Sequence, residues 1–178
     1  IDLLNNGFLN NPNAVVVNKG KIEVSHTEDG FVNLGGHIIN HDSIISHDNI
    51  DYDLVNGGEL DNLSGATIYL HSITSLGGVG YYNLGINSRI DNYGRIEITE
   101  IAETGILNEG QFFNYDYIDI YSLPGDAIVN NNYFQNTPLA YLLIDGVYGS
   151  GNRGFINSLS VSNLINNGSI LINDIPSF

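Results

Sequence analysis

The sequence predicts an all-β chain folded as a β-solenoid, a rod of about seven stacked coils with ~25 residues in each coil. Three observations predict this fold class. A short motif recurs along nearly the whole chain, alternating aliphatic residues follow most of its copies, and the signals of helices are missing. The whole of residues 1–178 is predicted to be one such segment.

The recurring motif consists of two apolar residues, an Asn, any residue and a Gly. It matches residues 3–7, 31–35, 54–58, 81–85 and 106–110, and a copy at 128–132 carries Asn132 in place of Gly. A seventh copy begins at Phe155, with Leu159 where Gly is expected. The first Asn of the copies is Asn5, Asn33, Asn56, Asn83, Asn108, Asn130 and Asn157. This spacing of 22 to 28 residues is the main evidence for a repeated coil.

Each copy also contains a second Asn, after which aliphatic residues alternate with polar ones. The second Asn residues are Asn11, Asn40, Asn62, Asn92, Asn114, Asn136 and Asn163. The alternating pairs begin with Val15/Val17 and end with Ile170/Ile172, and the copy at Asn40 is less regular. Such alternation is typical of a strand with one buried face. No stretch has the i, i+3, i+4 pattern of an amphipathic helix.

Both Asn columns are predicted to stack from coil to coil and to form hydrogen-bonded ladders along the axis, as Asn does in stacked in-register sheets. The motif Gly is predicted to form the corner of the coil, since Gly adopts positive φ without a Cβ penalty. The predicted turn residues are Gly7, Gly35, Gly58, Gly85, Gly110 and Asn132, the last because Asn tolerates this conformation best after Gly. Phe8, Phe112, Phe134 and Phe155 are expected to fill the interior with the aliphatic residues.

Composition excludes several classes of partner. The chain has 20 acidic and 5 basic residues and a net charge of −15. Such a surface repels phosphate, so neither nucleic acid nor anionic lipid is expected as a partner. There is no cysteine and no apolar run near the ~20 residues that span a bilayer. Because the chain starts and stops within a repeat and opens without a signal peptide, we expect it to be a fragment of a much longer repeat-containing chain.

The pattern of Gly, two apolar residues, Asn, any residue and Gly, with a later Asn and a closing Ile-x-Ile, resembles the right-handed parallel β-helix repeats of large secreted bacterial surface proteins. These adhesin-like proteins are common among the Bacteroidota. The resemblance extends from Leu3 to Ile172. It implies a single-stranded right-handed parallel β-helix, an extracellular or cell-surface location, and a structural or adhesive role. The same architecture also carries polysaccharide lyases and hydrolases, so the fold alone does not decide function.

Two acidic groups are the candidates for catalysis. Asp48, Asp51 and Asp53 lie close in sequence, near His41 and His47, and a second group contains Glu97, Glu100 and Glu103. Hydrolysis of a glycosidic bond needs two carboxylates facing one substrate. Neither group recurs on neighbouring coils, and neither is expected to have a basic partner close by, which favours solvated joins between coils. No catalytic residue is therefore assigned, and a polysaccharide-degrading enzyme remains the alternative function.

Metal and cofactor signals are weak. His37, His41, His47 and Asp42 match no known ligand spacing, so no metal ligand is assigned. Ca²⁺ on carboxylate-rich joins is the single cofactor candidate, because hard cations prefer oxygen ligands. The GxGxxG match at 149–154 is followed by a strand pattern where a dinucleotide fold needs a helix, and we interpret it as a loop.

The sequence thus favours a non-enzymatic structural or adhesive module that gives length and stiffness to a bacterial appendage. The expected partners are neighbouring repeats, a second copy of the chain, or surface glycans bound by exposed Tyr. An ice-binding face is disfavoured because the Thr residues form no column.

Overall fold

A computed structural model describes residues 6–73, 75–148 and 152–174. All the regular structure in these ranges is β-strand, arranged in three seven-stranded parallel sheets. Sheet A contains β1 (Asn6–Asn10), β4 (Asp29–Asn33), β7 (Tyr52–Asn56), β10 (Val79–Asn83), β13 (Thr104–Asn108), β16 (Asp126–Asn130) and β19 (Phe155–Asn157). Sheet B contains β2 (Val15–Asn18), β5 (His37–Asn40), β8 (Glu59–Asn62), β11 (Arg89–Asn92), β14 (Gln111–Asn114), β17 (Tyr133–Asn136) and β20 (Asn163–Asn166). Sheet C contains β3 (Lys21–Ser25), β6 (Ser43–His47), β9 (Thr67–Ile73), β12 (Arg95–Ile101), β15 (Tyr117–Leu123), β18 (Tyr141–Val147) and β21 (Ser169–Ile172).

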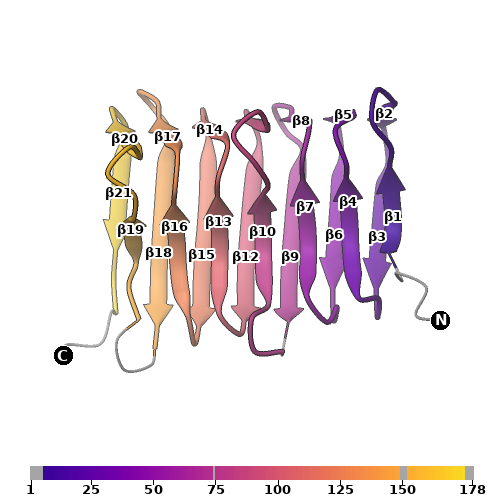
Figure 1. The fold of residues 1–178 in the computed structure, drawn as a ribbon. Coiled ribbons are helices and arrows are strands. Elements are labelled where there is room, and N and C mark those ends of the chain that lie inside the picture. The colour runs from indigo at the N-terminus through magenta and orange to yellow at the C-terminus, as the bar shows by residue number, and fades with distance from the viewer. Residues whose placement is uncertain (1–5, 74, 149–151, 175–178) are drawn as a thin grey trace.

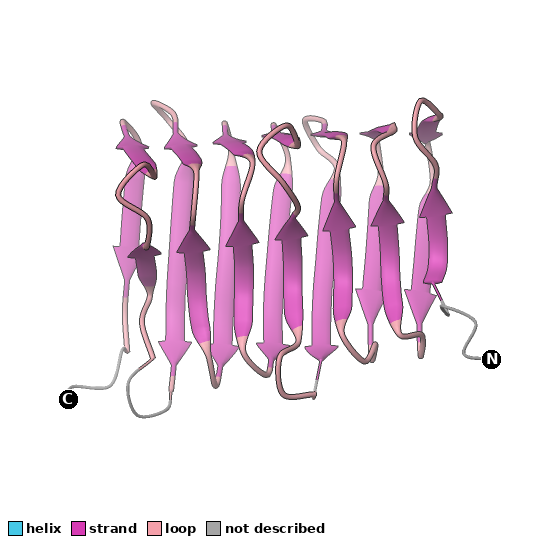
Figure 2. Ribbon diagram, viewed as in Figure 1, coloured by secondary structure: helices cyan, strands magenta, loops and turns pink. Residues whose placement is uncertain are grey.

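Each coil uses one strand from each sheet in the order A, B, C, so coil 1 is β1–β3 and coil 7 is β19–β21. The coils stack side by side into a rod, with the short sheet B strands along one long edge (Figure 1). The prediction of a β-solenoid is confirmed, with about seven coils of about 24 residues. The three corners of each coil are called the A–B, B–C and C–A corners below (Figure 2).

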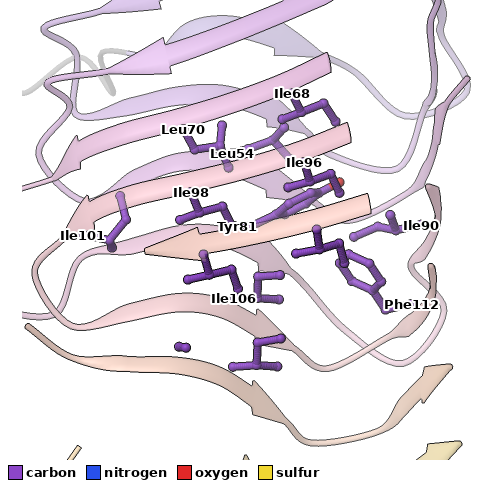
Figure 3. Packing of buried hydrophobic residues seen from close by; sticks show 14 of the residues in the cluster. Leu54, Ile68, Leu70, Tyr81, Ile90, Ile96, Ile98, Ile101, Ile106 and Phe112 are labelled. Atoms are coloured by element: carbon purple, nitrogen blue, oxygen red, sulfur yellow. The ribbon is translucent and has the colours of Figure 1, made fainter. Parts of the chain in front are cut away.

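The interior is a continuous apolar column because the strands pair in register from coil to coil. In sheet C, Ile68, Ile96 and Ile118 stack directly, as do the following aliphatics Leu70, Ile98 and Ile120. All six are fully buried, and Figure 3 shows several of them meeting residues of sheets A and B. Coupling between adjacent coils therefore extends through the whole core.

The predicted Phe interior is largely correct. Phe112 and Phe134 are fully buried, while Phe8 and Phe155, in end coils, are partly buried and packed against the core. Two further rings, Phe31 and Tyr81, lie in the Phe8 column of sheet A and are also fully buried.

The predicted phase of coil 1 was wrong. Its buried sheet C positions are taken by Ile22 and Val24, which align with Ile44 and Ser46. Val15 and Val17 instead lie in β2 with outward-facing, exposed side chains. Residues 3–7 match the motif, but they do not form a corner of the coil. The connection between β1 and β2 is residues 11–14, which contain no Gly.

The predicted role of the motif Gly as a positive-φ corner is correct at Gly35 (φ 125°) and Gly85 (φ 83°) only. Gly7 lies within strand β1. Gly58, Gly110 and Asn132 lie outside the left-handed region, immediately before sheet B strands. A Cβ on Gly110 would lie 2.6 Å from Nδ2 of Asn83 and closer still to Oγ of Ser88. Glycine is therefore required there for close packing of neighbouring coils and not for its dihedral angles.

The left-handed corner of the coil is the C–A corner, which the motif does not mark. One residue in each coil has positive φ at an equivalent place at or just beyond the end of the sheet C strand, and Gly77 adds a second in the connection of coil 3. The seven equivalent residues are His26, Asp48, Ser72, Glu100, Ser122, Gly146 and Asp174, with φ between 49° and 67°. Only one of them is Gly, so the stacked coils hold ordinary residues in a conformation that normally disfavours them.

Candidate functional site

The most regular polar feature of the molecule is a pair of Asn ladders, one at the end of sheet A and one at the end of sheet B. In the sheet A ladder each side-chain amide donates to Oδ1 of the Asn on the next coil at 2.7–3.0 Å. Its members are Asn10, Asn33, Asn56, Asn83, Asn108, Asn130 and Asn157. All but the last are buried.

The sheet B ladder has the same geometry, with amide-to-Oδ1 distances of 2.8–2.9 Å. Its members are Asn18, Asn40, Asn62, Asn92, Asn114, Asn136 and Asn166. Eleven of the fourteen predicted ladder residues lie in these two columns. Two of the others were predicted wrongly. Asn11 is exposed at the A–B corner, and the sheet B ladder residue of coil 1 is Asn18. Asn163 begins strand β20, and the ladder residue of coil 7 is Asn166. Asn5 lies outside the described residues, and Asn10 holds the corresponding place.

Each ladder amide also fixes the following corner. Nδ2 of Asn108 donates to Oδ1 of Asn130 at 2.7 Å and to the carbonyl oxygen of Tyr133 at 2.8 Å. Tyr133 is the first residue of the next sheet B strand, so one side chain joins two coils and holds the turn between two sheets. Both amide protons are thereby used inside the protein, as a buried Asn requires.

The predicted acidic group at 48–53 does not form one site. Asp53 is fully buried inside the solenoid, in a column of sheet A that holds Gly30 on the coil before and Gly80 on the coil after. Asp48 lies outside, where its Oδ2 meets Nδ1 of His47 at 2.7 Å, and this hydrogen bond lowers the pKa of Asp48. The carboxyl groups of Asp48 and Asp53 therefore cannot act on one substrate.

Asp53 belongs to a polar cluster that replaces the apolar core at the C–A corner of coils 1 to 3. Oδ1 of Asp53 accepts a hydrogen bond from Nδ2 of Asn49 at 2.7 Å, and Oγ of Ser46 donates to the Asp53 carbonyl at 2.7 Å. The hydroxyl of Thr27 reaches Oδ1 of Asn49 at 2.7 Å. Oδ2 of Asp53 has no partner among the described residues. Burial raises the pKa of Asp53 to about 8, so the carboxyl is largely neutral at neutral pH.

The second acidic group is paired with a base, contrary to the expectation from sequence. Arg95 contacts Glu97 at 3.0 Å and Asp119, on the next coil, at 3.1 Å. The hydroxyl of Tyr121 donates to Oε1 of Glu97 at 2.7 Å. Glu100 occupies the left-handed corner and Glu103 lies in the join after it. Asp119 and Tyr121 come from the next coil, so spacing within one repeat does not reveal them, whereas Arg95 lies two residues before Glu97 on strand β12 and the sequence interpretation missed it.

The predicted histidine group also separates. His37, in sheet B, contacts Asp61 on the next coil at 2.9 Å, whereas His41 lies at the B–C corner. His47 in sheet C stacks on His71 with ring centroids 4.8 Å apart. Burial and the nearby His47 lower the pKa of His71. In the part of the chain that the structure describes, no group of three His, Asp or Glu side chains has an arrangement that fits a metal ion.

Tyr and Phe side chains gather on the outer surface of coils 4 to 6. Tyr93 stacks on Tyr115 with centroids 4.3 Å apart, Tyr117 stacks on Tyr141, and the Arg89 guanidinium lies 4.3 Å from the centre of Phe113. The ring faces are largely used by neighbouring coils, so these residues add lateral packing between coils.

Comparisons with known proteins add no family. No family model, curated protein sequence or solved structure matches the chain. None of the residues described in the structure forms a helix long and apolar enough to cross a membrane.

Proposed function

We propose that the chain is a structural module that gives length and stiffness to a larger secreted or cell-surface assembly. The observation that supports this most directly is the pair of Asn ladders, each running without interruption through all seven coils. Parallel sheets and a shared core accompany them along the same axis.

The mechanism is mechanical. Separating two coils breaks the pairing of three strands, two ladder hydrogen bonds and the core contacts between them, and it exposes buried amides without partners. An unsatisfied buried polar group costs about 1–3 kcal/mol, so local opening of one coil is resisted by its neighbours on both sides. A rod built this way is expected to transmit tension and bending along its length.

Single-molecule pulling along the rod axis tests this proposal. We expect high resistance to extension, and a lower unfolding force after Asn108→Leu than after Gly20→Ala, which changes a position with nothing within 4 Å of its Cβ. A chain that unfolds coil by coil at low force, with no difference between the two variants, would contradict the proposed mechanical role.

The alternative function, polysaccharide cleavage, has no specific observation in its favour. Asp53 is enclosed in the core, which leaves Asp48 and Asp51 as the members of the predicted 48–53 group with exposed or half-buried side chains. The double variant Asp48→Asn/Asp51→Asn, assayed with the wild type on acidic and neutral polysaccharides, tests it. Activity in the wild type that this variant loses would replace the structural proposal.

A further inference from the structure

The A–B corner of the rod alternates between ridges and hollows with a spacing of three coils. The connection from sheet A to sheet B is longest in coils 1, 4 and 7, where residues 11–14, 84–88 and 158–162 form it. In coils 2, 3, 5 and 6 it shortens to residues 34–36, 57–58, 109–110 and 131–132. The wide loops after β10 and β19 are visible along the upper edge of the rod (Figure 2).

The two hollows lie between these ridges. One, of ≈ 330 Å³, covers coils 2 and 3, where the exposed Gly35 and the half-buried Gly57 and Gly58 carry no side chain over the backbone. The other, of ≈ 310 Å³, covers coils 5 and 6 and is lined by Gln111, Phe113, Asn132 and Tyr133. The coil 2–3 hollow is bounded by the short connections and by Asn13 and Asn87 of the flanking ridges, whereas the coil 5–6 hollow is bounded by Asn132 and by residues of strands β14 and β17.

The ridges of coils 4 and 7 present aliphatic side chains to solvent. Ile86 at the coil 4 ridge is 73% exposed, and Val161 at the coil 7 ridge is 72% exposed. Leu84 and Leu159 beside them are also exposed. Clustered exposed aliphatics of this kind mark interaction surfaces in soluble proteins.

Few charged residues lie in the connections at this corner, although Glu59 of strand β8 lines the coil 2–3 hollow. Of all the residues in the seven A–B connections, every one of which the structure describes, Glu109 alone is charged. The whole chain has a net charge of −15. Two copies that approach along another, more acidic edge repel each other, whereas this edge lets them meet with little repulsion.

We propose that the A–B corner binds a second copy of this chain, antiparallel to the first, so that the ridges of each copy enter the hollows of the other. Ridges and hollows share one spacing of three coils, about 14 Å at ~4.8 Å per coil. A two-fold axis that places the coil 4 ridge over the partner's coil 5–6 hollow also places the coil 7 ridge over the partner's coil 2–3 hollow. Both contacts then occur twice, as in an isologous dimer.

In this dimer each exposed aliphatic side chain of a ridge contacts one hollow of the partner. Ile86 meets the aromatic hollow beside Phe113 and Tyr133, and Val161 meets the glycine-lined hollow over Gly35 and Gly58. A partner without a three-coil spacing could fill one hollow but would not match successive ridges, which is why a second copy fits this edge best.

Sedimentation velocity over a wide range of protein concentration tests the proposal. The wild type is expected to form a dimer, and Ile86→Asp is expected to weaken association at least tenfold. Leu139→Asp is the matched control, because Leu139 is 99% exposed at the B–C corner and away from the proposed contact. Circular dichroism of each variant verifies that the fold is retained.

Cysteine cross-linking supplies a second readout, since the chain contains no cysteine. Ile86→Cys combined with Gln111→Cys is expected to give an intermolecular disulfide on mild oxidation, whereas Leu139→Cys with Gln111→Cys is not. A protein that remains monomeric at all concentrations, or a dimer that Ile86→Asp and Leu139→Asp weaken equally, would overturn the proposed contact. If the protein is monomeric, the pulling experiment can still support the structural role, so the dimer proposal and the proposed function can be refuted independently.

Discussion

Nδ2 of Asn49 donates a hydrogen bond of 2.7 Å to Oδ1 of Asp53, and both side chains are buried inside the solenoid. On coils 3 to 6 the residue after the left-handed corner is a buried aliphatic, such as Ile73 or Ile101. Asn49 takes that place on coil 2, and Asp53 fills a position that is Gly on the adjacent coils. The core of the rod thus contains a polar, titratable cluster at the C–A corner of coils 1 to 3.

Asp53→Asn is expected to change how stability depends on pH. Because folding raises the Asp53 pKa from 3.8 to about 8, this group favours the folded state fully below its unfolded pKa. That contribution is lost as pH rises through the folded value. Asp53→Asn cannot ionise, so the free energy of unfolding of the variant minus that of the wild type should increase with pH.

Chemical denaturation of both proteins from about pH 5 to about pH 9 measures this difference, and other titrating groups cancel in it. A difference that stays constant across the range would show that Asp53 is already ionised in the folded protein.

Asn108→Leu is expected to lower the free energy of unfolding by about 1–3 kcal/mol for each buried group that it leaves unsatisfied. The variant removes the acceptor for Asn83 and the donor to Asn130. Thermal or urea unfolding measures the loss. Asn167→Leu, at an exposed position of the B–C corner away from the proposed contact, serves as control and should change stability far less. Equal effects of the two changes would mean that the ladder adds little to stability.

Gly110→Ala should destabilise the protein by about 1–3 kcal/mol through overpacking, because the new Cβ meets Ser88 and Asn83 of the preceding coil. Gly110→Asn and Gly110→Val should both be at least as harmful, since no left-handed conformation favours Asn at this place. Gly20→Ala, with open space around its Cβ, should be neutral or slightly stabilising. Urea denaturation curves compare all four variants, and a harmless Gly110→Val would show that the coils can separate locally.

Glu100→Gly is expected to raise the free energy of unfolding by about 0.5–1 kcal/mol, because φ of Glu100 is 57° and Gly adopts this conformation without strain. Glu103→Gly is the matched control at the same corner, where φ is not positive and the added chain entropy should destabilise the fold. Melting temperatures that shift in the same direction for both variants would argue against strain at the left-handed column.

Tyr81→Phe is expected to stabilise the protein or leave it unchanged, since the Tyr81 hydroxyl is buried and finds no hydrogen-bond partner in the described part of the chain. Tyr121→Phe should instead be destabilising by about 0.5–1.5 kcal/mol, because the Tyr121 hydroxyl donates to Glu97. Calorimetry of the two variants gives the comparison, and a large loss in Tyr81→Phe would indicate a buried water that pairs with the hydroxyl.

The sequence by itself determined the repeat, the fold class and most of both ladders. A solenoid repeats its physical environment in every coil, so residues such as Asn33 and Asn56 recur at a period that can be read directly. The sequence was a poorer guide to structure where one coil departs from the repeat. The strand positions of coil 1 were predicted wrongly because residues 3–7, which end in Gly7, match the motif. The ladder residue of this coil is Asn10, which has no Gly two residues after it.

The tertiary structure decided everything that depends on contact between coils. The stacking of His47 on His71, the pairing of Arg95 with Asp119 and the enclosure of Asp53 join residues 24 or more positions apart or depend on the inward direction of one side chain. The sequence also did not predict the column of positive-φ residues at the C–A corner. The stacked coils hold His, Asp, Ser and Glu residues in this conformation, so no residue type marks it. Local residue preferences are weaker than the packing of seven coils against one another, so only the folded rod shows which residues bear the strain.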